Sequence, residues 1–257
     1  MTEPKVLEDV NFFRQHGAKI GIASVLAFTS GIVDIIGYHG VFHYFTAHLT
    51  GTTVQLGHSL ISRNTKDIAA AGVILSAFFL GSLIGRALIE LGSRTQLRRI
   101  ASITLMIEAV LLAVVAGWFT EGGTPYWGLA ALAGSMGIQT ATMTGIGPLT
   151  VHTTFVTGMV NKLAQLVSRI SFRSFDFWKT KSRTAVQQRN QSKEIQLASF
   201  IFGVWICYAG GAVLGTWSFG FWGLRALFIA VGLLGVSLLT DQIRPLSVRE
   251  EKEQSES

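Results

Sequence analysis

The sequence predicts an all-α polytopic membrane protein with about six transmembrane helices and two re-entrant or broken half-helices, arranged as two inverted three-span repeats. Of its 257 residues, 49% are hydrophobic and 14% are charged, whereas soluble domains contain about 25% charged residues. A helix needs about 20 apolar residues to cross a bilayer. Six runs of that kind occupy residues 20–42, 68–91, 100–119, 127–147, 195–217 and 221–241.

These runs divide the chain into two membrane halves with polar ends. Residues 1–19 are expected to be a cytoplasmic N-terminal segment without the features of a removable signal peptide. The first half covers 20–119, the second covers 120–242, and the tail 243–257 is polar and expected to be disordered. A hydrophilic stretch at 168–194 is interpreted as a cytoplasmic loop facing anionic headgroups, and not as a nucleic-acid site. Its basic residues are Arg169, Arg173, Lys179, Lys181, Arg183, Arg189 and Lys193.

Polar stretches of similar sequence occur once in each half. The first, TAHLTGTTVQLG, is centred on Thr50 and Gly51, and the second, TTFVTGMVNKLA, is centred on Thr157 and Gly158. Each follows a glycine in an apolar run at a similar distance: Gly31 and Gly51 are 20 residues apart, and Gly137 and Gly158 are 21. Each precedes a run with two glycines four residues apart, which lets helix backbones approach closely in lipid. Those pairs are Gly81 with Gly85 and Gly211 with Gly215.

The topology depends on whether these two polar stretches cross the membrane. If they turn back, each half has three spans and the second half is inverted; if they cross, there are eight spans and the halves are parallel. Counts of Lys and Arg on the two sides, 16 to 3 against 15 to 4, do not decide between these topologies. Residues 46–62 carry too many polar groups for a lipid-facing helix, and irregular backbone at membrane depth requires protein or water around it. The composition therefore favours re-entrant or broken helices.

Ionisable and polar residues at membrane depth are the candidates for a solute or ion site. Half-helix ends can present unpaired N–H groups to a ligand, with Thr as a cap and Gly allowing close approach. The predicted site contains Asp34, His48, Thr50, Gly51, Gln139, Thr140, Thr157, Gly158 and Lys162. Asp34 and Lys162 are expected to pair across the two halves, so that a proton or a substrate competes for the pair. The alternatives are a buried structural ion pair, or a Lys162 side chain that extends to the membrane interface. Asp34 and Glu108 are candidates for a proton relay.

No enzyme, metal or cofactor signature accompanies these residues. His39 and His43 are four apart, but no cysteine or acidic cluster completes a metal site. The one cysteine, Cys207, lies in an apolar run and is interpreted as a packing residue. We therefore expect a protein that is not an enzyme and holds neither a cofactor nor a metal.

Several of these runs together resemble a known family. LAFTSGIVDIIGY, HLTGTTVQLG, GIQTATMTGIG and TTFVTGMVNKLA resemble the YoaK-like family of bacterial integral membrane proteins, over roughly residues 20–242. The resemblance implies a membrane protein with about six spans and implies no established activity. Thr52 and Thr140 stand where the family often has Asn, so an amide that both donates and accepts is replaced by a hydroxyl. If those amides recognise a substrate, this chain prefers a different one.

The expected function is a secondary transporter or permease for a small solute, working by alternating access between inverted repeats. The alternatives are a membrane scaffold or assembly factor that docks partners through the basic loop, and a channel. The expected partners are the lipid bilayer and a small-molecule or ion substrate, with possible homo-oligomers and no nucleic acid. The expected location is the cytoplasmic membrane, multi-pass, with both termini cytoplasmic.

Overall fold

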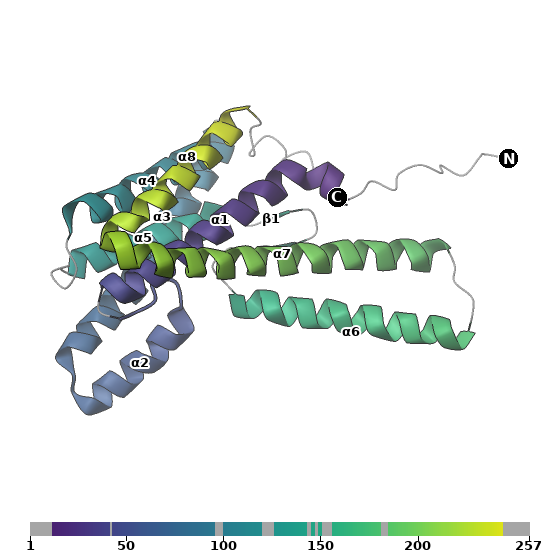
Figure 1. The fold of residues 1–257 in the computed structure, drawn as a ribbon, viewed down its shortest axis with the longest axis horizontal. Helices are drawn as coiled ribbons and strands as arrows, with labels where there is room; N and C mark the ends of the chain where they lie inside the picture. Colours follow the sequence, from purple (N-terminus) through teal and green to yellow (C-terminus); the bar gives the residue numbers. More distant parts are fainter. Residues whose placement is uncertain are drawn as a thin grey trace.

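A computed structural model describes residues 12–41, 43–95, 100–119, 126–142, 145–146, 149–150, 156–180 and 185–243. These residues form a bundle of helices (Figure 1). The helices are α1 (Phe12–Gly40), α2 (Leu49–Ser62), α3 (Thr65–Thr95), α4 (Ile100–Trp118), α5 (Tyr126–Thr142), α6 (Val156–Thr180), α7 (Ala185–Trp222) and α8 (Leu227–Ile243). A short 3₁₀ turn, η1 (Gly223–Ala226), joins α7 to α8. Two strands of two residues each, β1 (Gly145–Ile146) and β2 (Leu149–Thr150), pair in antiparallel fashion.

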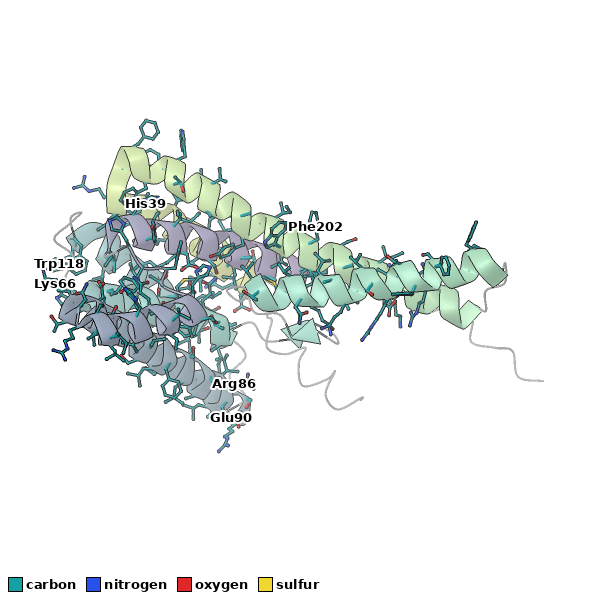
Figure 2. The ribbon with its side chains drawn as sticks, turned by 90° about the horizontal axis from the view of Figure 1, so that it is seen from below. His39, Lys66, Arg86, Glu90, Trp118 and Phe202 are labelled. Carbon is teal, nitrogen blue, oxygen red and sulfur yellow. The ribbon has the colours of Figure 1, made fainter. Side chains whose placement is uncertain are left out.

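Each apolar run expected from the sequence falls largely within one of these helices. Four stretches of helix are long and apolar enough to cross a membrane: Lys19–Gly40, Thr65–Thr95, Ile100–Trp118 and Gln191–Gln242, the last of which includes parts of both α7 and α8. Many large apolar side chains on these helices point outward, as lipid-facing residues do. Examples are Phe79, Leu83, Val110, Val213 and Phe228. Figure 2 places His39, Lys66 and Trp118 toward one end of the bundle.

Helices α1 and α7 come into direct backbone contact. A Cβ added to Gly31 would overlap the carbonyl oxygen of Tyr208, and one added to Gly211 would overlap the carbonyl oxygen of Phe28. Only glycine permits such an approach of one backbone to another. Phe28 lies beside Gly211 and Ile32 beside Gly215, so both helices run in the same direction.

Helices α3 and α5 make the same kind of contact. A Cβ on Gly81 would overlap the carbonyl oxygen of Gly134, and one on Gly137 would overlap the carbonyl oxygen of Phe78. Gly85 lies beside Ile138, so this pair is also parallel. Each close pair therefore takes one helix from each half of the chain.

Helix α5 runs antiparallel to α1 where the two pairs meet. Gln139 near the end of α5 bonds Leu26 in the middle of α1, whereas Leu132, earlier in α5, lies beside Gly37 near the end of α1. Helix α4 packs on both α5 and α8. The largest side chains that are fully buried come from these four helices and from α3: Leu26, Ile32, Ile36, Ile74, Leu105, Leu112, Leu129, Leu132, Met136, Leu227 and Leu234.

Helix α2 packs against α3, and α6 packs against α7. Figure 1 shows α6 and the first part of α7 projecting together from the bundle. Much of 168–194, expected as a loop, is therefore helical. The physical reason is an apolar stripe at helical spacing on α6, which packs against α7: Met159, Leu163, Leu166 and Ile170. Farther out, Arg173 Nη1 lies 2.8 Å from Glu194 Oε2.

A candidate site around Asp34

The chain beyond α1 folds back along the helix that it has just left. Helix α1 ends at Gly40, and His43 takes a left-handed backbone conformation with φ 56°. The side chain of Thr46 then packs against Gly37, where an added Cβ would lie 2.9 Å from its methyl group. The returning segment reaches Asp34, six residues before the end of α1, or about 9 Å along the helix axis. Polar backbone is thereby brought beside a buried carboxylate.

Asp34 is 1% exposed, and both of its carboxylate oxygens accept hydrogen bonds. Oδ1 accepts from the Thr46 hydroxyl at 2.8 Å and from the Ala47 backbone N–H at 2.9 Å. Oδ2 accepts from the Tyr208 hydroxyl of α7 at 2.7 Å. A buried carboxylate is tolerated when donors satisfy its oxygens. We call Asp34, Thr46, Ala47 and Tyr208 the Asp34 knot.

His48 connects the Asp34 knot to the surface. Its Nδ1 lies 3.6 Å from Asp34 Oδ2, and 43% of the side chain is exposed. Its ring centroid lies 4.7 Å from that of Phe45 and 6.4 Å from that of Tyr208. His48 is also the N-cap residue of α2, and its carbonyl accepts a hydrogen bond from the Thr52 backbone N–H in the first turn of that helix. This histidine therefore lies between the buried Asp34 carboxylate and the exposed surface.

Gln139 of α5 lies one helical turn away along α1. Its Nε2 donates to the Leu26 carbonyl at 2.8 Å, and its Oε1 lies 3.1 Å from the Ser30 hydroxyl. Both Gln139 and Ser30 are fully buried. Because Ser30 precedes Asp34 by four residues, Ser30, Gln139 and the Asp34 knot form a polar strip along α1.

The remaining predicted residues lie elsewhere. Thr50 and Gly51 are exposed on α2, and Thr157 and Lys162 are exposed on α6 while Gly158 is half-buried. Thr140 bonds the Met136 carbonyl of its own helix at 2.8 Å. A ligand held between the two Thr-Gly stretches stays a prediction.

The expected pairing of Asp34 with Lys162 is not formed among the described residues. Both carboxylate oxygens of Asp34 accept bonds from Thr46, Ala47 or Tyr208, and Lys162 is exposed on α6. The physical reason is that hydroxyl and backbone donors lie close enough to satisfy the carboxylate without a second charge.

The two histidines that lie four residues apart, His39 and His43, pack against aromatic rings. The His39 ring is stacked on Phe219 at 5.4 Å, and His43 meets Tyr38 edge-on at 5.5 Å. Within the described ranges, no group of three His, Cys, Asp or Glu side chains is placed to hold a metal ion.

Comparison with known proteins identifies the family. A family model described as "Protein of unknown function (DUF1275)" matches residues 22–240, which include the Asp34 knot and the polar strip. The chain belongs to the DUF1275 family. The UPF0700 transmembrane protein YoaK of Bacillus subtilis (strain 168) is 33% identical over 156 residues, or 60% of this chain and 68% of that protein. No solved structure matches the chain. The resemblance to the YoaK-like family is thus confirmed, and this DUF1275 protein is a membrane protein.

Sequence reasoning missed three side chains of the polar strip and the Asp34 knot in this DUF1275 protein: Ser30, Thr46 and Tyr208. Ser30 and Thr46 are small hydroxyl residues that are common in membrane helices, so neither carries a specific signal. Tyr208 had a usable one, because it is a tyrosine three residues before Gly211 inside an apolar run. Phe78 holds the corresponding place before Gly81. Because Tyr208 has a hydroxyl where the first half has a phenylalanine, its hydroxyl is expected to have a hydrogen-bond partner inside the bundle.

Proposed function

We propose that this DUF1275 protein is a secondary transporter or permease for a small solute in the cytoplasmic membrane, with both termini on the cytoplasmic side. The observation that carries the proposal is the buried Asp34 carboxylate, which is held by groups from α7 and from the segment that leads into α2. Ionisable groups buried in membrane bundles mark substrate and ion pathways. Each donor to Asp34 can be displaced by a proton or by a solute.

Two inverted three-span repeats are supported by the directions of the helices. Helix α1 runs antiparallel to α5, its counterpart in the second half, as an odd number of crossings between them requires. Glycines at equivalent positions of the two halves also make equivalent contacts. Gly31 and its counterpart Gly137 each lie against a carbonyl oxygen of the partner helix, and so do Gly81 and its counterpart Gly211. Inverted repeats of this kind are a common transporter design.

The re-entrant reading of the first polar stretch is supported by length and by the path of the chain. Helix α2 has 14 residues, about 21 Å at 1.5 Å per residue, which is shorter than the roughly 30 Å hydrocarbon core. The segment before it returns to Asp34 and does not continue away from α1. We therefore assign six crossings, by α1, α3, α4, α5, α7 and α8.

The Asp34 knot links two groups of helices. Oδ2 is bonded to Tyr208 within the α1–α7 pair, whereas Oδ1 is bonded to the segment leading into α2, which packs on α3. Protonation of Asp34, or a solute that takes its acceptors, weakens the link between the two groups. That is the differential interaction which a conformational switch requires.

The transport proposal is tested in liposomes that contain the purified protein and a trapped pH-sensitive dye. Amino acids, organic amines, sugars and monocarboxylates are added outside in turn under an imposed pH gradient. We expect one of these classes to give a saturable proton movement, and Asp34→Asn to lower its initial rate at least tenfold. Thr216→Ala, on an exposed face of α7, serves as the control and keeps the rate. Full activity of Asp34→Asn would remove Asp34 from the mechanism, and flux that does not saturate would indicate a channel.

A docking function is the second candidate, favoured by the projecting hairpin of α6 and α7 with its exposed basic residues. The double variant Arg169→Glu, Lys193→Glu reverses two exposed charges without touching the Arg173–Glu194 pair. If the protein is a transporter, we expect this variant to keep the liposome flux. Loss of a cross-linked partner from membranes, with no flux in the wild type, would instead support docking.

A further inference from the structure

A second acidic residue lies inside the bundle, away from the Asp34 knot. Glu108 is near the middle of α4, and none of its surface is exposed. Neither of its carboxylate oxygens has a hydrogen-bond partner in the part of the chain that the structure describes. This differs from Asp34, whose two oxygens both accept bonds.

Little opposite charge is available from the helices that pack on α4. Helix α5 contains no charged residue, and the only charged residue of α8 is Asp241, which accepts a bond from Ser102. Ser102 precedes Glu108 by six residues, about 9 Å along the helix. The neighbouring turn η1 contributes Arg225, which is exposed. On α3, which makes a smaller contact, Glu90 is bonded to Arg94, and Figure 2 shows Arg86 and Glu90 near the end of that helix.

The hydroxyl groups on these helices are also directed elsewhere. Thr104, one turn before Glu108, donates to the Ala101 carbonyl at 2.9 Å. Ser135 of α5 and Ser237 of α8 likewise donate to carbonyls of their own helices, at 2.8 and 3.1 Å. An ionised carboxylate in such surroundings lacks both a counter-charge and donors, and its desolvation costs several kcal/mol.

We propose that Glu108 is a proton-binding site of the bundle: it carries a proton in this conformation and exchanges it when α4 separates from α5 or α8. Asp34 and Glu108 then have different tasks. Asp34 accepts bonds and links helices, whereas Glu108 stores a proton in an apolar contact. Its use as the carrier of the coupling proton rests on the proposed transport function, but the proton-binding site itself does not.

Carbodiimide labelling in native membranes at pH 7 tests the site directly. An apolar carbodiimide takes the proton of a neutral carboxyl group on its nitrogen, and the carboxylate oxygen adds to its central carbon. Migration of the acyl group to nitrogen then leaves a stable adduct that contains the whole reagent. We use dicyclohexylcarbodiimide as the apolar probe, a water-soluble carbodiimide as its counterpart, and peptide mass spectrometry as the readout.

We expect dicyclohexylcarbodiimide to modify Glu108, and the water-soluble reagent to leave it unmodified. Glu90, whose side chain is 54% exposed, is the matched control and should react only with the water-soluble reagent. Glu108→Gln should lose the adduct and keep its thermal unfolding temperature, because one neutral group replaces another. No reaction of Glu108 with the apolar reagent, or equal reaction with both, would overturn the proposal.

The liposome assay separates this proposal from the transport function. If Glu108 carries the coupling proton, Glu108→Gln should retain solute exchange and lose the response to a pH gradient. An unchanged pH response would remove Glu108 from coupling. Absence of flux in the wild type would count against transport alone, since the labelling result decides the proton-binding site.

Discussion

Asp34→Ala is expected to destabilise the protein by about 3 kcal/mol or more, because it leaves buried donors without an acceptor, each worth about 1–3 kcal/mol. The donors are Thr46, Ala47 and Tyr208. For a chain of this size, the thermal unfolding temperature should fall by about 6–12 °C. Tryptophan fluorescence during heating in detergent measures this change.

Two milder substitutions at the same site are expected to reduce stability by smaller amounts. Tyr208→Phe removes one bond to a charged acceptor and should cost about 1.5–3 kcal/mol. Asp34→Asn keeps an acceptor for Thr46 and Ala47 and should cost about 1 kcal/mol. Thr216→Ala, whose hydroxyl bonds only the carbonyl of Ala212 in its own helix, should shift stability by less than about 0.5 kcal/mol. Equal unfolding temperatures for Asp34→Ala and this control would show that the Asp34 knot does not form.

Gly211→Ala is expected to destabilise the α1–α7 pair even though alanine is the better helix former. The new methyl group overlaps the Phe28 carbonyl oxygen, and a backbone cannot move aside as a flexible side chain can. Overpacking costs about 1–3 kcal/mol in ordinary cores. Gly81→Ala, which overlaps the Gly134 carbonyl in the α3–α5 pair, should have an effect of similar size.

Controls for these glycines lie on the same helices. Gly203 of α7 and Gly72 of α3 have nothing within 4 Å of an added Cβ. Their replacement by alanine should leave stability unchanged or raise it by up to about 1 kcal/mol through helix propensity. If all four variants unfold at one temperature, the helix pairs are not in backbone contact.

The helices, and the glycines at which they come into close contact, were largely predictable from the sequence, whereas the pairing of α1 with α7 and of α3 with α5 was not. Apolar runs fix where long helices form, and the glycines at four-residue spacing, Gly81 with Gly85 and Gly211 with Gly215, do lie at helix contacts. The helical hairpin at 168–194 was missed because its many charges dominate the composition. The apolar stripe of α6, which includes Met159 and Leu166, is visible only when helical periodicity is traced through a polar segment.

The candidate site was predictable only in part. Asp34 and Gln139 stand out because polar groups in apolar runs are rare, and the structure places them on one polar strip of α1 and α5. Their partners were not predictable. Whether Asp34 meets Lys162 or Tyr208 depends on the three-dimensional path of the returning segment, and a hydroxyl that lies close satisfies the carboxylate without the desolvation of a second charge.

Because helices of the two halves pair with each other, neither half of the sequence is an independent structural unit. Helix α1 has its backbone-close partner in α7, and α3 has its partner in α5, so each tight pair contains one helix from 20–119 and one from 120–242. A half chain expressed alone would expose two bare glycine ridges to lipid. We therefore expect the rigid units of this protein to be the α1–α7 and α3–α5 pairs, and not residues 20–119 and 120–242. If the proposed transport involves a rocking movement, we expect it to separate the α1–α7 pair from the α3–α5 pair, and the chain passes between these two pairs several times.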